Sequence, residues 1–257
     1  MGDIKSVKKR MIFAAVAAAL MLLISSICLA ITAQTPLPVF AARKIPIYRV
    51  NTQNNFVSLT FDAAWGADKT QGILDILDEY EIKCTFFLVS FWMEAHPDMV
   101  REIALRGHEI GTHSATHPDM TKLSEKQIQQ ELLGSIKIIE DLTGRKVTLF
   151  RAPFGAYDNK LLTVTEELKL FTIQWDVDSL DWKGLSAKEI ASRIQKAKKG
   201  SIILCHNNSD NILAALHLII ESVRVKGLSF VPVGQLIYAS NYYIDGAGEQ
   251  HSTNQKN

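Results

Sequence analysis

FVSLTFDAAWG, residues 56–66, is a short apolar run that ends in a carboxylate and then breaks at Trp-Gly. Its β-branched, aliphatic and aromatic residues are typical of a strand buried on both faces, and Gly66 allows a turn before a helical pattern begins. Asp62 therefore stands where a parallel strand opens into its loop, the end at which α/β sheets and barrels usually place chemistry. Taken alone, Asp62 fits a helix cap or a turn equally well.

Further apolar runs of strand type follow, and helical patterns lie between them. The runs cover residues 84–89, 108–112, 147–150, 171–175, 201–205 and 229–233. Capping boxes at Ser124 with Gln127 and at Ser186 with Glu189 mark two helix starts. Crossovers of this length join parallel strands. We therefore expect an α/β fold, an irregular or incomplete (β/α) barrel of about seven parallel strands, one fewer than in a standard barrel.

The N-terminal region is a separate segment. Basic residues precede residues 11–33, an uncharged run of 23 residues that is long enough to cross a bilayer as a helix. The charge asymmetry predicts a cytoplasmic N-terminus and an extracytoplasmic remainder. Two outcomes stay open. The length of the run favours one transmembrane anchor, whereas small-residue sites at 31–33 and 39–41 are compatible with a cleaved signal peptide and a secreted protein.

These patterns divide the chain into four parts. They are a signal or transmembrane segment (1–33), a linker (34–54), a folded domain (55–240) and a polar tail predicted to be disordered (241–257). The formal net charge of +1 provides no basic field, so nucleic acid is not an expected partner. No obligate protein partner is predicted either. Cys84 and Cys205 lie in apolar runs, which predicts buried free thiols rather than a disulfide.

Ionisable residues follow five of the predicted strands. In chain order they are Asp62, His113 with His117, Arg151, Asp178 with Asp181, and His206. Loops at the carboxyl ends of parallel strands open on one face, so we expect these side chains to converge. Two histidines four residues apart can direct both imidazoles at one ion such as zinc. That spacing alone also fits two unrelated surface histidines. Beside the strand-end residues Asp62, Arg151 and His206, however, it indicates a metal centre.

Five motifs in this order, TFD, HSATH, RAPFG, DSLDW and LCH, resemble those of the polysaccharide deacetylases, the NodB-homology domain of carbohydrate esterase family four. The resemblance covers residues 55–238, nearly the whole region after the linker. It implies hydrolysis of the acetamide of N-acetylglucosamine units in a cell-wall polysaccharide, peptidoglycan or a chitin-like polymer. The implied partners are this glycan and, through the N-terminal helix, the membrane.

The resemblance also implies a role for each residue at the reacting centre. His113 and His117 match the ligands of a divalent metal, with zinc favoured over cobalt or another ion, which lowers the pKa of its water and polarises the amide oxygen. Asp62 matches the general base, and His206 matches the general acid that protonates the leaving amine. Arg151 matches the arginine that pairs with the base.

Further residues match supporting positions of the family. Asp181 resembles the acidic partner of His206, with Asp178 as the alternative. Phe154 and Trp182 match apolar walls for the acetyl methyl and the sugar face, and the backbone N–H near Phe154 is a candidate oxyanion donor. Trp65 is a further candidate for substrate contact.

One position departs from the family pattern. The first motif of the family carries two adjacent aspartates, base and then metal ligand, whereas Ala63 follows Asp62 here. The site would therefore use two histidines plus water, borrow Asp68, or bind no metal tightly. The TFDAAWG form resembles a branch that includes sporulation-associated members.

Three interpretations of the function stay open. The first is a metal-dependent deacetylase, because the acid, the base and both histidines are retained. The second is a catalytically impaired glycan-binding or structural wall protein, because Ala63 offers no ligand. The third is hydrolysis of another C–N bond, such as that of a cyclic amide, which the membrane signal disfavours.

Overall fold

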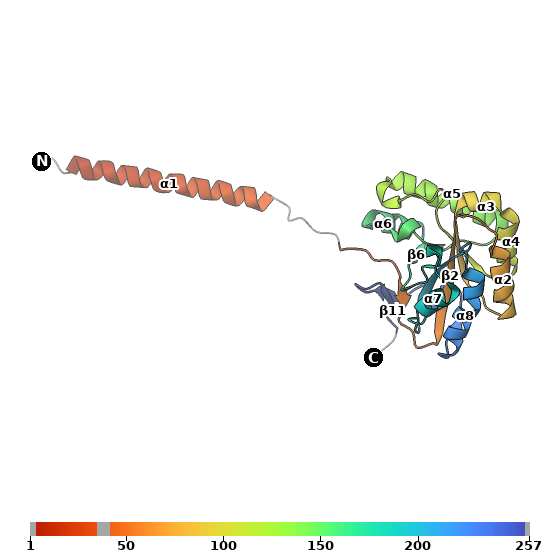
Figure 1. The fold of residues 1–257 in the computed structure, drawn as a ribbon. Helices are drawn as coiled ribbons and strands as arrows, with labels where there is room; N and C mark the ends of the chain where they lie inside the picture. Colours follow the sequence, from red (N-terminus) through yellow and green to blue (C-terminus); the bar gives the residue numbers. More distant parts are fainter. Residues whose placement is uncertain (1–3, 35–41, 255–257) are drawn as a thin grey trace. The chain divides into compact units, whose positions relative to one another are not determined.

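The structure is a computed structural model that describes residues 4–34 and 42–254 (Figure 1). It falls into two units that divide after Arg43. The first unit holds helix α1 (Ile4–Gln34), whose residues 4–28 are long and apolar enough to cross a membrane. The predicted N-terminal helix is thus present, and it includes the basic residues before the apolar run. The candidate cleavage site at 39–41 lies outside the described residues.

The second unit is built on a parallel sheet with β2 (Phe56–Ala63) at its centre. The strand order is β6-β5-β4-β3-β2-β8-β7, and β9 pairs with the start of β2. The remaining bounds are β3 (Thr85–Leu88), β4 (Glu109–Thr112), β5 (Leu149–Phe150), β6 (Phe171–Thr172), β7 (Val177–Asp178), β8 (Ile202–His206) and β9 (Ser229–Phe230). All of these strand pairs are parallel, and the predicted incomplete α/β barrel is confirmed as a curled half-barrel.

A short connection causes the curl. The sequence predicts one strand over 171–175, but the structure forms β6, a break, and then β7 at the opposite edge of the sheet. Residues 173–176 are the whole link between the two edges. An extended chain of that length spans at most about 18 Å, so the edges must approach one another.

The segment that enters the domain lies at this opening. Ile47 forms a parallel bridge to Ile173, just beyond β6, and β1 (Arg49–Val50) follows beside Gly200, just before β8. A side chain at Gly200 would place its Cβ 1.7 Å from the carbonyl oxygen of Val50, and the backbone there has a φ of +78°. Only glycine allows this close approach. The predicted linker therefore ends before β1.

Helices cover the outside of the sheet. They are α2 (Thr70–Glu79), α3 (Ser90–Ala95), α4 (Pro97–Leu105), α5 (Glu125–Thr143), α6 (Asn159–Glu167), α7 (Ala187–Ile194) and α8 (Ile212–Arg224). The short α9 (Val233–Leu236) instead packs in a separate buried cluster with Phe87 and Ile202, on the opposite face of the sheet. Neighbours pack in the order α7, α8, α2, α4, α5, α6, which follows the strand order (Figure 1). Both predicted capping boxes are present, at the starts of α5 and α7. The thiols of Cys84 and Cys205 are free and buried, as predicted.

The end of the second unit folds back on the start of that unit. β10 (Tyr242–Ile244) and β11 (Glu249–Ser252) form an antiparallel hairpin, and β11 pairs in parallel with β1. The prediction of a disordered tail is wrong for this hairpin. Backbone pairing with β1, the fully buried side chain of Gln250 and the packing of Ile244 against a buried apolar cluster hold the hairpin in place.

We predict that Gln250→Ala destabilises the domain by about 1–3 kcal/mol, because it leaves two partly buried backbone groups without partners. The Gln250 amide accepts a hydrogen bond from the N–H of Tyr238 at 2.9 Å and donates one to its carbonyl at 2.8 Å. Urea unfolding of the full chain in detergent, followed by tryptophan fluorescence, measures the change. Gln130→Ala, on the exposed face of α5, is the control. Equal stability of the two variants would contradict the prediction.

Candidate active site

Asp62 lies near the carboxyl end of β2 with its side chain buried. Its Oδ1 accepts a hydrogen bond from Nη1 of Arg151 at 2.8 Å, and its Oδ2 lies 3.6 Å from Nε2 of His113. Burial is the largest single influence and opposes the charge of the carboxylate, but the charge and hydrogen bond of Arg151, together with the nearby His113 and His206, outweigh it and lower the pKa of Asp62. Asp62 is therefore ionised at neutral pH and able to accept a proton.

Arg151, directly after β5, is fully buried beneath this site. Nη1 also donates to Oγ1 of Thr60 at 2.7 Å, Nη2 donates to the carbonyl of Gln174 at 3.2 Å, and Nε donates to that of Ile173 at 3.4 Å. Its guanidinium lies 4.2 Å from the centre of the Phe87 ring. Each nitrogen of the guanidinium thus has an acceptor, as a buried cation requires. The same bonds tie β2 to the chain that follows β6.

His113 and His117 follow β4 and face one another, with ring centres 4.9 Å apart and planes at 72°. Nδ1 of His113 lies 2.8 Å from the carbonyl oxygen of Arg151 and is the donor in that bond, which leaves the lone pair on Nε2. Burial lowers the pKa of His113, and it lowers that of His117 to about 4. Both rings are therefore neutral at pH 7, the form that binds metals.

The loop that carries these histidines is strained and needs support. Ser114 and His117 have φ values of +75° and +57°, which are uncommon for residues other than glycine. The Glu131 carboxylate, from α5, accepts hydrogen bonds from the N–H groups of Ala115 at 2.9 Å and Thr116 at 2.8 Å. Sequence reasoning missed Glu131, because nothing in a surface helix marks one glutamate as the anchor of a distant loop.

His206 ends β8 and is bound by Asp181, the first residue of the 3₁₀ turn η3 (Asp181–Lys183). Its Nδ1 lies 2.7 Å from Oδ1 of Asp181, and its backbone N–H donates to Oδ2 at 2.8 Å. Burial disfavours the charge on His206, but the hydrogen bond and charge of Asp181 outweigh it and raise the pKa of His206. The alternative partner, Asp178, instead accepts a hydrogen bond from the N–H of Leu180.

A cavity of about 840 Å³ opens over these groups. Its lining includes the sequence-predicted residues Asp62, His113, His117, Asp181, His206, Phe154, Trp65 and Trp182. The three aromatic side chains are exposed, and the rings of Trp65 and Phe154 lie 4.9 and 4.7 Å from the ring of His117. A polar centre with apolar walls is the usual composition of a small-molecule site.

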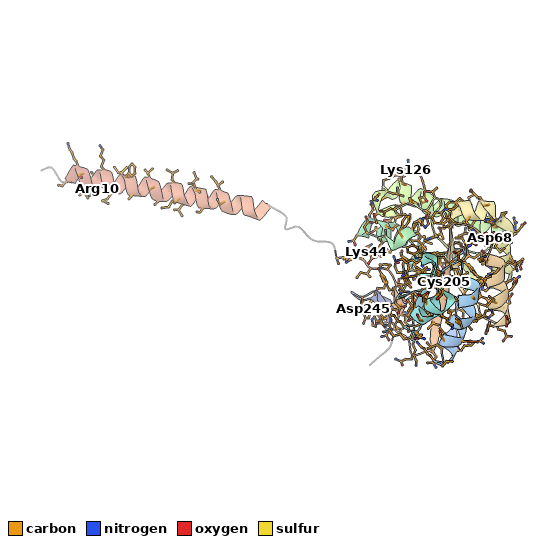
Figure 2. All side chains as sticks on the ribbon, viewed as in Figure 1. Arg10, Lys44, Asp68, Lys126, Cys205 and Asp245 are labelled. Atoms are coloured by element: carbon orange, nitrogen blue, oxygen red, sulfur yellow. The ribbon has the colours of Figure 1, made fainter. Side chains whose placement is uncertain are left out.

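The donors present fit a divalent ion held by two histidines. Neutral imidazoles with a carboxylate nearby are ligands that zinc accepts. Ala63 offers no donor; it is buried in the apolar core, and Ala64 is the neighbour that lines the cavity. Asp68 is exposed and does not line the cavity, so it does not supply the third ligand; Figure 2 labels it near the outer edge of the domain.

A second group of possible metal ligands lies elsewhere. Among residues 4–34 and 42–254, Asp245, Glu249 and His251 bring their ligand atoms within 4.8 Å of one another. Ion pairs account for this group, since His251 lies 3.2 Å from Asp245, and Arg49 lies 3.2 Å from Glu249. These contacts hold the C-terminal hairpin against β1.

Asn207, which directly follows the LCH motif, joins two of the loops around the cavity. Its Nδ2 donates to the carbonyl of Gly66 at 2.9 Å and to Oγ1 of Thr70 at 3.0 Å. The Trp92 indole donates to the same carbonyl at 2.7 Å. The loop that carries Trp65 is thereby fixed to the end of β8. The sequence analysis did not single out Asn207, although its position directly after the LCH motif could have marked it as part of the site.

Comparison with known sequences gives related proteins over most of the chain. A family described as polysaccharide deacetylase matches residues 49–173. A peptidoglycan-N-acetylglucosamine deacetylase of Bacillus cereus is 34% identical over 190 residues, which is 72% of this chain and 69% of that protein. Other relatives are longer. The chain spans 60% of YlxY of Bacillus subtilis and 41% of PgdA, a peptidoglycan-N-acetylglucosamine deacetylase of Listeria monocytogenes, each at 32% identity over 75% of this chain.

Solved structures share the fold. The Bc1960 peptidoglycan N-acetylglucosamine deacetylase matches with a TM-score of 0.72 over 74% of this chain and 91% of that chain, at 31% identity. A CE4 family pseudoenzyme from Bacillus anthracis matches with the same TM-score over 80% of this chain and 72% of that chain, at 28% identity. A mutant of this pseudoenzyme has restored enzymatic activity. The relatives thus include both active and inactive proteins.

We predict that Asp181→Asn lowers the pKa of His206, because the neutral amide no longer stabilises the imidazolium. NMR titration of the His206 ring measures the change. The ordinary pKa is 6.5 and the folded value lies above it. The ion pair between His206 and Asp181 therefore stabilises the fold fully at a pH below the ordinary histidine pKa. Its contribution is lost as the pH rises through the raised pKa of His206. Unfolding free energies of native and variant protein should differ more in acid than in alkali. An unchanged pKa would contradict the prediction.

Proposed function

The chain belongs to the polysaccharide deacetylase family, and from this membership we propose that it hydrolyses the acetamide of N-acetylglucosamine units in a cell-wall glycan. The observation that carries the proposal is a cavity with two oppositely tuned groups. Asp62 has a lowered pKa and stays ionised, whereas the pKa of His206 is raised, which favours its protonated form. A base and an acid with separated pKa values are what hydrolysis of an amide needs.

The chemistry follows from these positions. Asp62 takes a proton from the attacking water while Arg151 keeps the carboxylate ionised and oriented. His206 gives its proton to the leaving nitrogen, and Asp181 stabilises the imidazolium before that transfer. A divalent ion bound by His113 and His117 would lower the pKa of water and polarise the amide oxygen. The N–H groups near Phe154 are candidate donors to the developing oxyanion.

The surroundings are consistent with a polymeric substrate. Exposed aromatic walls at Phe154, Trp182 and Trp65 suit the acetyl methyl and the apolar face of a sugar. The apolar helix α1 suits an extracytoplasmic protein that is either anchored in the membrane or secreted after cleavage. Peptidoglycan is the substrate that the names of the relatives favour. A role in sporulation, suggested by the TFDAAWG form, belongs to the same proposal.

We predict that Asp62→Asn and His206→Ala each reduce acetate release by at least about a hundredfold while leaving the fold intact, because each removes one proton transfer. The assay uses the full chain in detergent, stripped with chelator and then supplied with Zn²⁺ or Co²⁺. Acetate is measured from N-acetylglucosamine oligomers and from peptidoglycan. Asp68→Asn, outside the cavity, is the control variant.

The same assay can refute the role assignment. Unchanged turnover in either variant would show that the residue does not transfer a proton. Release that is independent of added metal would remove the metal from the mechanism. No release from folded native protein with any substrate or metal would favour the second candidate function.

That second candidate is a catalytically impaired protein that binds glycan without cleaving it. Two observations favour it: Ala63 provides no metal ligand, and a CE4 family pseudoenzyme shares the fold. Tight glycan binding without acetate release would support this function. Weak binding with turnover would support the enzyme.

We predict that the two alanines after Asp62 respond differently to aspartate. Ala64→Asp should tighten zinc binding by at least about tenfold, because position 64 lines the cavity with His113 and His117 and an aspartate there can add the missing carboxylate. Ala63→Asp should instead lower stability, because it buries a carboxylate in the apolar core. Competition with a zinc-binding dye and urea unfolding measure the two effects. Unchanged zinc affinity in the first variant would contradict the prediction.

A further inference from the structure

The pairing of β7 with β8 stops just before it reaches His206. Asp178, the last residue of β7, lies beside Leu204, two residues before His206 on the parallel strand. A longer β7 would offer a backbone carbonyl to the N–H of His206. The buried carboxylate of Asp181 accepts this bond instead, at 2.8 Å, and its other oxygen lies 2.7 Å from Nδ1 of the same histidine. Both contacts require the chain to bend sharply after β7.

Leu180 makes this bend, in a conformation that is unfavourable for leucine. Its φ is +51° and its ψ is +29°, in the left-handed region. A side chain with a Cβ crowds the backbone there, and the apolar side chain of leucine cannot compensate with a local hydrogen bond. The 3₁₀ turn η3 follows directly and carries Asp181. Neighbouring groups must therefore stabilise the bend.

The side chain of Asp178 provides that support. Its Oδ1 accepts a hydrogen bond from the N–H of Leu180 at 2.8 Å, which is the bond of an Asx turn. The Oγ of Ser179 accepts a weaker bond from the N–H of Asp181 at 3.3 Å. The backbone at Asp178 is itself fixed, since its carbonyl accepts a bond from Nε of Arg193, on α7, at 2.9 Å. The carboxylate of Asp178 is thus used within the turn.

We propose that Asp178 is a positioning residue whose hydrogen bond to Leu180 holds the turn that presents Asp181 to His206. The inference rests on the proposed function in taking His206 as the proton donor of the reaction. Without this bond nothing offsets the unfavourable conformation of Leu180. The turn would then relax to a commoner conformation, and Asp181 would move out of hydrogen-bond distance of the imidazole.

The position of the turn can be separated from the charge of Asp178. That charge also favours the imidazolium form of His206. Asparagine at position 178 keeps the acceptor oxygen of the turn and loses the charge. Glycine at position 180 acts from the other side, because it adopts a positive φ without strain and needs no supporting bond. Asp178→Asn, and Asp178→Ala combined with Leu180→Gly, should therefore keep Asp181 in place, whereas Asp178→Ala alone should not.

The proton that Nδ1 of His206 donates to Asp181 reports this geometry directly. We expect native protein, as the full chain in detergent with ¹⁵N-labelled histidine and no added metal, to show this proton at low field in its NMR spectrum. Its absence from His206→Ala assigns the resonance. Asp178→Ala should move the resonance upfield or remove it. Asp178→Asn and the double variant should retain it.

Two further variants serve as controls. Leu180→Gly alone should retain the low-field proton, because the turn then has both the bond and a favourable residue. Asp245→Ala removes a bond of the same kind elsewhere, since Asp245 accepts a hydrogen bond from the N–H of Ala247 at 2.9 Å in the C-terminal hairpin. This variant should retain the proton as well, because Asp245 does not line the cavity.

Kinetics of acetate release distinguish positioning from general damage to the fold. Asp178→Ala should lower kcat by at least about tenfold and change KM by less than about twofold, because a misplaced proton donor affects the transition state and not the binding of the glycan. Asp178→Asn, the double variant and Asp245→Ala should each keep kcat within about threefold of the native value.

Several results would overturn the inference. They are a native spectrum without the low-field proton, an unchanged proton in Asp178→Ala, and an equal loss in Asp178→Ala and Asp178→Asn, which would assign the effect to charge. If Asp178→Ala does not fold, the double variant decides, and loss of the proton there would also overturn the inference.

The spectra and the acetate assay separate this inference from the proposed function. Acetate release together with an unchanged resonance in Asp178→Ala would refute the positioning role and leave the deacetylase function standing. The expected pattern of resonances without acetate release from the native protein would support the positioning role and refute the enzyme.

Discussion

The buried ion pair between Asp62 and Arg151 constrains the rest of the domain. A guanidinium without solvent is tolerated only when acceptors surround it, and removing one partner of such a pair typically costs about 3–5 kcal/mol. The acceptors come from β2 and from the chain after β6, which are distant in sequence. Satisfying Arg151 therefore brings these segments together, and the same geometry keeps Asp62 charged beneath the cavity.

The opening in the half-barrel is the second constraint. A sheet with two edges that approach but do not pair leaves backbone groups in need of partners. The entering segment at Ile47 and β1 supplies some of them, and the C-terminal hairpin pairs with β1 in turn. The two ends of the domain thus stabilise each other. Backbone pairing and the apolar cluster that contains Ile47 and Val50, with Ile244 packed against it, hold them together.

The altered first motif is separate from the two titrating groups of the site. Asp62 and His206, the proposed proton acceptor and donor, are each stabilised by a partner of their own, Arg151 and Asp181, and neither partner depends on Ala63. In the proposed function, the missing ligand carboxylate would weaken metal binding without disturbing the acid and the base. A family that contains both enzymes and a pseudoenzyme is consistent with such independence.

By itself, the sequence determined the alternation of strands and helices, the apolar N-terminal helix, and the convergence of Asp62, the two histidines and His206. These follow from local periodicity and from the rule that parallel strands end on one face. The tertiary structure alone decided the edge position of β7, the order of the polar hairpin, the anchoring of the histidine loop by Glu131 and the choice of Ala64 over Ala63 as cavity lining. Each depends on contacts between distant segments, which local patterns do not encode.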